Sequence, residues 1–289
     1  MSLVHVIILA VVQGLAELLP VSSSAHVVVA EKLLGLDPSS PPMTLLLVML
    51  HTGTMFAVIV YFWQKWRSTY FRDLASFKKF AQRVIVATIL TGVIGEVIIK
   101  GIEKTAFRHA PHAQIEDLFS HLELIAPALA LAGLLIFMAG MREKRSPSSA
   151  QADTVELNTG QASLIGAVQG LCLPFRGFSR SGATISAGML AGVAKARAEN
   201  FSFALAVVLT PVVVAREVLR LVQAQADGTA HNLTSALFPS LLGMFFAFLA
   251  GLVALRWLSS WLEGGRWYLF GIYCLVAAAI VATLHGKGY

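Results

Sequence analysis

Six long apolar runs constrain this chain more than any other feature of its sequence. A helix needs about 20 predominantly apolar residues to cross the hydrocarbon core of a bilayer, and each run comes close to that length. Only 13% of the 289 residues are charged, whereas soluble domains carry about 25%. The sequence therefore predicts an all-α integral membrane protein with spans at residues 44–63, 84–100, 124–141, 201–219, 236–255 and 267–284.

Two further apolar regions are interrupted by polar residues, at 3–36 and at 163–193. Each predicts a short helix, a polar break and a second short helix, and neither short helix is long enough to span a membrane. A broken backbone is tolerated at membrane depth only where it is buried in protein or lines a wet cavity. We therefore expect each region to form a re-entrant helix hairpin.

The distribution of Lys and Arg predicts how the chain is oriented. The loop 64–83 carries six cationic side chains, and the loop 142–160 opens with three more. Loops rich in Lys and Arg face the cytoplasm, and these two loops are separated by two spans, so they share a side. Segment 1–36 then enters the membrane from the outside and segment 161–196 from the inside, which gives the two halves inverted topology.

The halves also share a motif, because Gln-Gly-Leu begins at Gln13 and again at Gln169, each time followed by a proline and a serine cluster. Inverted repeats of broken helices place a polar site near the membrane midplane, where the two breaks meet. Each predicted repeat consists of a re-entrant helix hairpin plus three transmembrane helices. We predict one membrane domain over 1–289, with a first inverted repeat at 1–141, a cytoplasmic linker at 142–160 and a second inverted repeat at 161–289.

Glu17 leads the candidate site residues in the first break. A carboxylate at membrane depth is energetically expensive and usually faces a bundle interior or a wet cavity. Gln13 lies four residues earlier, on the same helix face. Glu17 could bind a divalent cation, orient a water molecule or act as a base, and a structural hydrogen bond to the broken backbone is the other interpretation.

Three serines follow Pro20, where the next short helix begins. Ser22, Ser23 and Ser24 could bind an anion at the helix N-terminus, or they could only cap the helix and pack. His26 lies on the first turn of that helix. It could act as a general acid, a general base or a nucleophile.

The second break centres on Arg180. A guanidinium remains charged and forms bidentate contacts with phosphate oxygens, although Arg180 could instead pair with a carboxylate such as Glu17. Ser179, Ser181 and Thr184 are predicted to bind the same anion. Gln13, His51, Gln169 and Arg176 are predicted to support the site from its surroundings, and Arg176 could equally line it or reach the membrane interface.

An acid–base histidine, a carboxylate, hydroxyls at helix starts and an arginine together suit an anionic phosphate held within a membrane. A lipid phosphate is a natural substrate, because its tail can stay in the bilayer. No Walker-type glycine loop is present, which argues against nucleotide hydrolysis. The net charge of +6 reports topology, and no nucleic-acid partner is expected.

Two runs carry a resemblance to a known family. QGLAELLPVSSSAH, from Gln13 to His26, resembles the first signature of the undecaprenyl-pyrophosphate phosphatase family, also called the bacitracin-resistance family. GFSRSGATIS, from Gly177 to Ser186, resembles its second signature. The resemblance extends over the whole chain.

The resemblance implies hydrolysis of a C55 polyprenyl diphosphate carrier to the monophosphate and inorganic phosphate, which recycles the carrier for peptidoglycan synthesis. It also implies bacitracin resistance, since bacitracin competes for this substrate, and a site on the periplasmic face of the bacterial inner membrane. A divalent cation, Mg²⁺ or Ca²⁺, is implied, with Glu17 as its ligand and Gln13 as a further position. The catalytic positions of the family fall on Glu17, Ser23, His26 and Arg180, and its motif threonine falls on Thr184.

Two departures from the family pattern bear on the site. Gln13 stands where the family often has a glutamate, and glutamine supplies no negative charge to a cation. Arg176-Gly177 stands where the family has Pro-Gly, which predicts a differently shaped bend. Either Ser23 or His26 could be the nucleophile.

Other functions remain in competition. Inverted repeats with broken helices also characterise transporters, so a polyprenyl-phosphate transporter or flippase is the alternative, and a purely structural protein would leave Glu17, His26 and Arg180 unexplained. A phosphatidic-acid-type phosphatase would need a His-x-x-x-Asp after Arg180, which this chain lacks. The expected partners are the lipid substrate and membrane lipids, and a homodimer is among the assemblies that the sequence allows.

Overall fold

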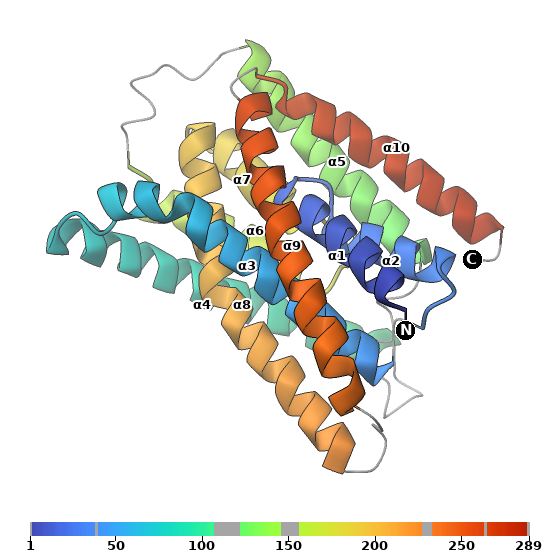
Figure 1. The fold of residues 1–289 in the computed structure, drawn as a ribbon. Coiled ribbons are helices and arrows are strands. Elements are labelled where there is room, and N and C mark those ends of the chain that lie inside the picture. The colour runs from blue at the N-terminus through green and yellow to red at the C-terminus, as the bar shows by residue number, and fades with distance from the viewer. Residues whose placement is uncertain are drawn as a thin grey trace. The chain divides into compact units, whose positions relative to one another are not determined.

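The computed structural model describes residues 2–37, 40–106, 122–145, 156–226, 233–262 and 265–287, and the regular elements among them are all helices (Figure 1). The central part of the predicted linker, residues 146–155, lies outside the described residues. The helices are α1 (Leu3–Leu18), α2 (Ser23–Leu33), α3 (Pro41–Thr69), α4 (Leu74–Ala106), α5 (Leu122–Arg145), α6 (Thr159–Cys172), α7 (Arg180–Leu190), α8 (Lys195–Ala226), α9 (Leu233–Leu262) and α10 (Trp267–Gly286).

Six of the described helices are long and apolar enough to cross a membrane, with mean hydropathies between 1.9 and 2.3. They are α3, α4, α5, α8, α9 and α10, and each contains one of the predicted spans. The prediction of an all-helical, multi-pass membrane protein is therefore confirmed.

The cationic segment 64–83 is mostly helical, because α3 continues to Thr69 and α4 already begins at Leu74. Asp73 caps α4, since its carboxylate accepts hydrogen bonds from the backbone N–H of Ser76 at 2.8 Å and the hydroxyl of Ser76 at 2.9 Å. Arg72 Nε donates to the same carboxylate at 2.8 Å. The Ser76 hydrogen bonds, followed by the contact with Arg72, lower the pKa of Asp73. The sequence predicts helix ends at the ends of the apolar runs, where the hydrocarbon layer ends. The helices continue past these points, because charged residues in water can remain helical.

Both interrupted regions form pairs of short helices. In the first pair, α1 ends before Leu19, whose extended conformation (φ −81°, ψ 151°) is the one that a following proline favours. In the second pair, Gly177 adopts φ +101° just before α7. A Cβ at this glycine would lie 2.6 Å from the carbonyl oxygen of Ile125, so only glycine fits this bend.

The described chain forms two compact units. The first contains residues 1–19, 23–61 and 206–259, and the second contains residues 20–22, 62–205 and 260–289. The core of the first unit includes Val6 and Leu9 of α1, Leu46 and Leu50 of α3, and Ala247 of α9.

Glycines let helices approach closely within both units. A Cβ at Gly14 of α1 would lie 2.5 Å from the Cβ of Ala250 on α9, in the first unit. A Cβ at Gly170 of α6 would lie 2.8 Å from the carbonyl oxygen of Thr91 on α4, in the second unit. Small residues at such crossings are typical of helix packing in membranes. There the hydrophobic effect does not drive helices together, so close van der Waals packing matters more.

Candidate functional site

A polar cluster in the first unit gathers around the carboxylate of Glu17. Its Oε2 accepts a hydrogen bond from the hydroxyl of Ser23 at 2.5 Å and another from Nε2 of Gln13 at 3.1 Å. Gln13 is fully buried, whereas the Glu17 side chain retains 14% exposure. Protein atoms therefore do not fully enclose the carboxylate.

Local sequence explains how these side chains meet. Gln13 and Glu17 lie one turn apart on α1 and so share a face. Pro20 interrupts the helix, and the chain turns back through Ser22, which adopts the left-handed conformation with φ 68°. Residues other than glycine rarely adopt this conformation, and strained backbone of this kind clusters at functional sites. The turn brings Ser23, the first residue of α2, back to Glu17.

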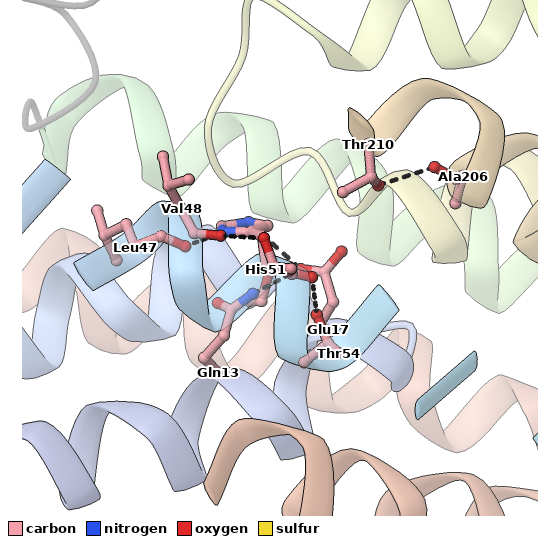
Figure 2. Close-up of polar contacts among 10 residues, drawn as sticks. Gln13, Glu17, Leu47, Val48, His51, Thr54, Ala206 and Thr210 are labelled. Carbon is pink, nitrogen blue, oxygen red and sulfur yellow. Dashed lines mark hydrogen bonds and ion pairs between the residues drawn. The ribbon is translucent and has the colours of Figure 1, made fainter. Parts of the chain in front are cut away.

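His51 of α3 belongs to the same cluster. Its Nδ1 lies 2.8 Å from the carbonyl oxygen of Leu47, which can only accept a hydrogen bond, so Nδ1 carries the proton. Its Nε2 lies 3.7 Å from Oε2 of Glu17. Figure 2 shows Gln13, Glu17 and His51 directed toward one another. The sequence indicated a supporting position for His51, and the structure places it beside the carboxylate.

The remaining candidates of the first motif lie at the break and at the start of α2. Ser22 is buried, and Ser24 and His26 are half-buried. Ser23, the neighbour of both, donates its hydroxyl to Glu17. The roles of Ser22, Ser24 and His26 in binding or catalysis stay predictions.

The second motif lies in the second unit, where Arg180 is the first residue of α7. The hydroxyl of Ser179 caps this helix by accepting a hydrogen bond from the backbone N–H of Gly182 at 3.2 Å. Arg180 is half-buried, and Ser181 is buried. Arg176 is half-buried in the bend that precedes the helix.

Two residues of this unit are bound to partners that the sequence did not suggest. The hydroxyl of the fully buried Thr184 lies 2.6 Å from that of Ser202 on α8 and donates to the carbonyl oxygen of Arg180 at 2.7 Å. Gln169 is also fully buried, and its Nε2 donates to the hydroxyl of Thr91 on α4 at 3.4 Å. These contacts give both side chains a structural function, whatever they do for a substrate.

The buried polar residues that the sequence patterns did not reveal include Thr91, Ser202 and Glu31. Thr91 and Ser202 lie within apolar spans, and no local pattern reveals their partners on other helices. Glu31 is fully buried on α2. Because a carboxylate within an apolar segment is expensive, Glu31 could have been identified in the same way as Glu17.

Among the described residues, no three His, Cys, Asp or Glu side chains gather into one metal-binding group. The cluster around Glu17 nevertheless offers ligands of suitable chemistry, namely a carboxylate, the imidazole of His51, the hydroxyl of Ser23 and the amide of Gln13. The buried Oε1 of Gln13 has no hydrogen-bond partner among the described residues. Such a donor set fits a divalent cation.

The fold and the site define a multi-pass membrane protein in which a carboxylate contacts a serine hydroxyl at one broken helix, and an arginine begins a second short helix. Residues 6–280 match the family described as bacitracin resistance protein BacA. The chain is 58% identical over 287 residues to undecaprenyl-diphosphatase 2 of Acinetobacter baylyi, covering 98% of each chain.

More distant relatives carry related names. Undecaprenyl-diphosphatase of Rhodopirellula baltica is 32% identical, covering 98% of each chain. Undecaprenyl-diphosphatase 2 of Burkholderia ambifaria is 33% identical, covering 96% of this chain and 95% of the relative. This chain therefore belongs to the BacA family of bacitracin resistance proteins.

Proposed function

We propose that this protein hydrolyses undecaprenyl diphosphate to undecaprenyl monophosphate and inorganic phosphate, and thereby recycles the lipid carrier and confers bacitracin resistance. Family membership and the names of the relatives support the substrate. The observation that carries the chemistry is the hydrogen bond from Ser23 to Glu17 at 2.5 Å. A hydroxyl that donates to a carboxylate has the arrangement of a nucleophile beside its general base.

In the proposed reaction, Ser23 Oγ attacks the terminal phosphorus while Glu17 accepts the hydroxyl proton. The bond between this phosphorus and the bridging oxygen breaks, and the polyprenyl monophosphate leaves. Water then hydrolyses the phosphoserine, which releases inorganic phosphate and restores the serine. The competing assignment, His26 as nucleophile, predicts a phosphohistidine, so acid-stable and acid-labile trapped phosphoenzyme would distinguish the two.

The role proposed for Arg180 is to bind the diphosphate. Its guanidinium can form bidentate contacts with phosphate oxygens and counter the charge of phosphoryl transfer. Arg180 also stands at the N-terminus of α7, where backbone N–H groups favour an anion. Ser179 and Ser181 lie beside it, although Ser179 already caps the helix.

We also propose a divalent cation, Mg²⁺ or Ca²⁺, held by Glu17 with Gln13 as a further position. Bound there, the cation would supply positive charge to the transferring phosphoryl group. Gln13 keeps the carboxylate oriented by donating from Nε2. Ser23 needs the same carboxylate as its proton acceptor, so the orientation of Glu17 matters to both roles.

The proposed architecture is an inverted repeat with two re-entrant hairpins, in the bacterial inner membrane, with the site facing the periplasm. Reciprocal packing supports the repeat. Gly14 of the first Gln-Gly-Leu packs on α9, from the second half of the chain, and Gly170 of the second packs on α4, from the first half. A homodimer remains a prediction. The orientation is tested by labelling single cysteines introduced into segment 64–83. These cysteines should react only with a reagent added from the cytoplasmic side.

Cells depleted of their own undecaprenyl-diphosphate phosphatases test the proposed function. Wild-type protein should restore growth and raise the bacitracin concentration that cells tolerate, whereas Glu17→Ala and Arg180→Ala should do neither at equal protein levels. Arg67→Ala, which removes an exposed cation, is the matched control and should behave as wild type. Growth restored by all variants alike would contradict the proposal.

A further inference from the structure

His51 stands where a second protein ligand of a cation at Glu17 would stand. The 3.7 Å between its Nε2 and Glu17 Oε2 is too long for a hydrogen bond. Two ligands bonded to one ion at about 2.0–2.2 Å lie roughly 3.0–3.7 Å apart for angles between octahedral and trigonal. The separation therefore suits an ion bound by both side chains.

The other ring nitrogen is already arranged for this role. Nδ1 of His51 donates to the carbonyl oxygen of Leu47 at 2.8 Å, so in the neutral ring the lone pair lies on Nε2, the nitrogen nearest Glu17. Histidines that ligate metals commonly donate their second nitrogen to a backbone carbonyl or carboxylate, which fixes the tautomer and the ring orientation. The His51 side chain is also 43% exposed, so other protein atoms leave room beside the ring.

Gln13 supplies the cluster with an amide in place of a second carboxylate, and this amide could reorient toward an ion. It contributes no charge, and its fully buried Oε1 has no hydrogen-bond partner among the described residues. A buried carbonyl oxygen without a hydrogen-bond partner destabilises the folded protein. Rotation of the amide by half a turn would present Oε1 to an ion beside Glu17 and remove this defect.

We infer that His51, together with Glu17, ligates the divalent cation of this protein and takes the place of a second carboxylate. Compared with two carboxylates, a carboxylate–imidazole pair still accepts Mg²⁺ and Ca²⁺, which prefer all-oxygen sites, and it accepts transition ions better. The protein therefore binds Mn²⁺ more tightly than Ca²⁺. The inference rests on the proposed function only in placing a cation at Glu17, and a binding experiment without substrate can test it.

The test is Mn²⁺ binding by purified, chelator-treated full-length protein, followed by electron paramagnetic resonance. In wild-type protein, an imidazole nitrogen bound to Mn²⁺ should modulate the electron spin echo. Labelling all histidines with ¹⁵N should change the frequency of this modulation. His51→Ala should lose the modulation and bind Mn²⁺ at least about tenfold more weakly, as disturbed metal sites do. The labelling needs no variant, so it remains informative if His51→Ala does not fold.

His285→Ala is the matched control, because His285 Nδ1 lies 3.4 Å from Glu123 Oε2 in a similar but exposed pair. It should leave Mn²⁺ affinity and modulation unchanged. Bound Mn²⁺ without imidazole nitrogen, modulation that survives in His51→Ala, or unchanged affinity in that variant would each overturn the inference. The last result would indicate a simple His51–Glu17 ion pair. Hydrolysis is measured separately, so a metal site without phosphatase activity would refute only the proposed function.

Discussion

Replacing Gln13 by glutamate should destabilise the protein without a cation and be rescued by one. Gln13 Nε2 lies 3.1 Å from Glu17 Oε2, so the introduced carboxylate would stand against the existing one. Two like charges about 4 Å apart repel by about 4 kcal/mol at an effective dielectric constant of about 20. Protonating a glutamate of ordinary pKa, about 4.3, at pH 7 costs about 3.7 kcal/mol. Whether the introduced carboxylate stays charged or becomes protonated, the free energy of unfolding should fall by about 4 kcal/mol.

The assay is reversible unfolding or thermal unfolding in detergent, with chelator and then with Mn²⁺. Gln13→Glu should lose stability in chelator and regain most of it with the cation, because an ion between two carboxylates replaces their repulsion with attraction. The loss in chelator should also shrink by about 1.4 kcal/mol for each pH unit below 7, since protonation becomes easier.

Gln169→Glu is the matched control, because Gln169 occupies the same motif position and is equally buried but donates to the hydroxyl of Thr91. Its introduced carboxylate should be destabilising at any cation concentration. Wild-type stability of Gln13→Glu in chelator, or equal rescue of both variants by Mn²⁺, would refute a cation site beside Gln13.

Three further perturbations probe individual contacts. Thr184→Val removes the hydroxyl that lies 2.6 Å from Ser202 and should lower the unfolding free energy by about 1–3 kcal/mol, because it leaves buried polar groups unsatisfied. Ser22→Gly should be stabler than Ser22→Ala by about 1 kcal/mol in the same assay, since φ 68° is strained for residues with a Cβ; equal stabilities would argue against that turn. Asp73→Asn should remove a pH dependence of the melting temperature. The folded-state pKa of Asp73 is lowered by its bonds to Ser76, so its stabilisation is present above the unfolded pKa and is lost as pH falls through the folded one; an Asn variant that melts with the wild-type acid profile would contradict this.

Composition and periodicity were enough to predict the six spans and the shared helix face of Gln13 and Glu17, because both depend on residues near in sequence. The turn that returns Ser23 to Glu17 was foreseeable only in part. Pro20 predicts the end of α1, but the left-handed Ser22 depends on the packing of the folded chain.

Contacts between distant helices could not be predicted from one sequence. Nothing local to His51 indicates that its Nε2 faces Glu17, and nothing local to Ser202 indicates that it meets Thr184 of α7. Such pairs depend on how helices cross, and crossings are set by contacts between residues far apart in the chain, as between Gly14 and Ala250.

The proposed phosphatase activity is tested most directly by measuring both products of undecaprenyl diphosphate with purified protein in detergent and a divalent cation. We expect one monophosphate and one inorganic phosphate for each diphosphate consumed. Rates should be at least about 100-fold lower in folded Glu17→Gln, which removes the proposed base, and should equal those of wild type in Glu123→Gln. Intact diphosphate after incubation with folded wild-type protein and any of Mg²⁺, Ca²⁺ or Mn²⁺, or undiminished release by Glu17→Gln, would contradict the proposed function.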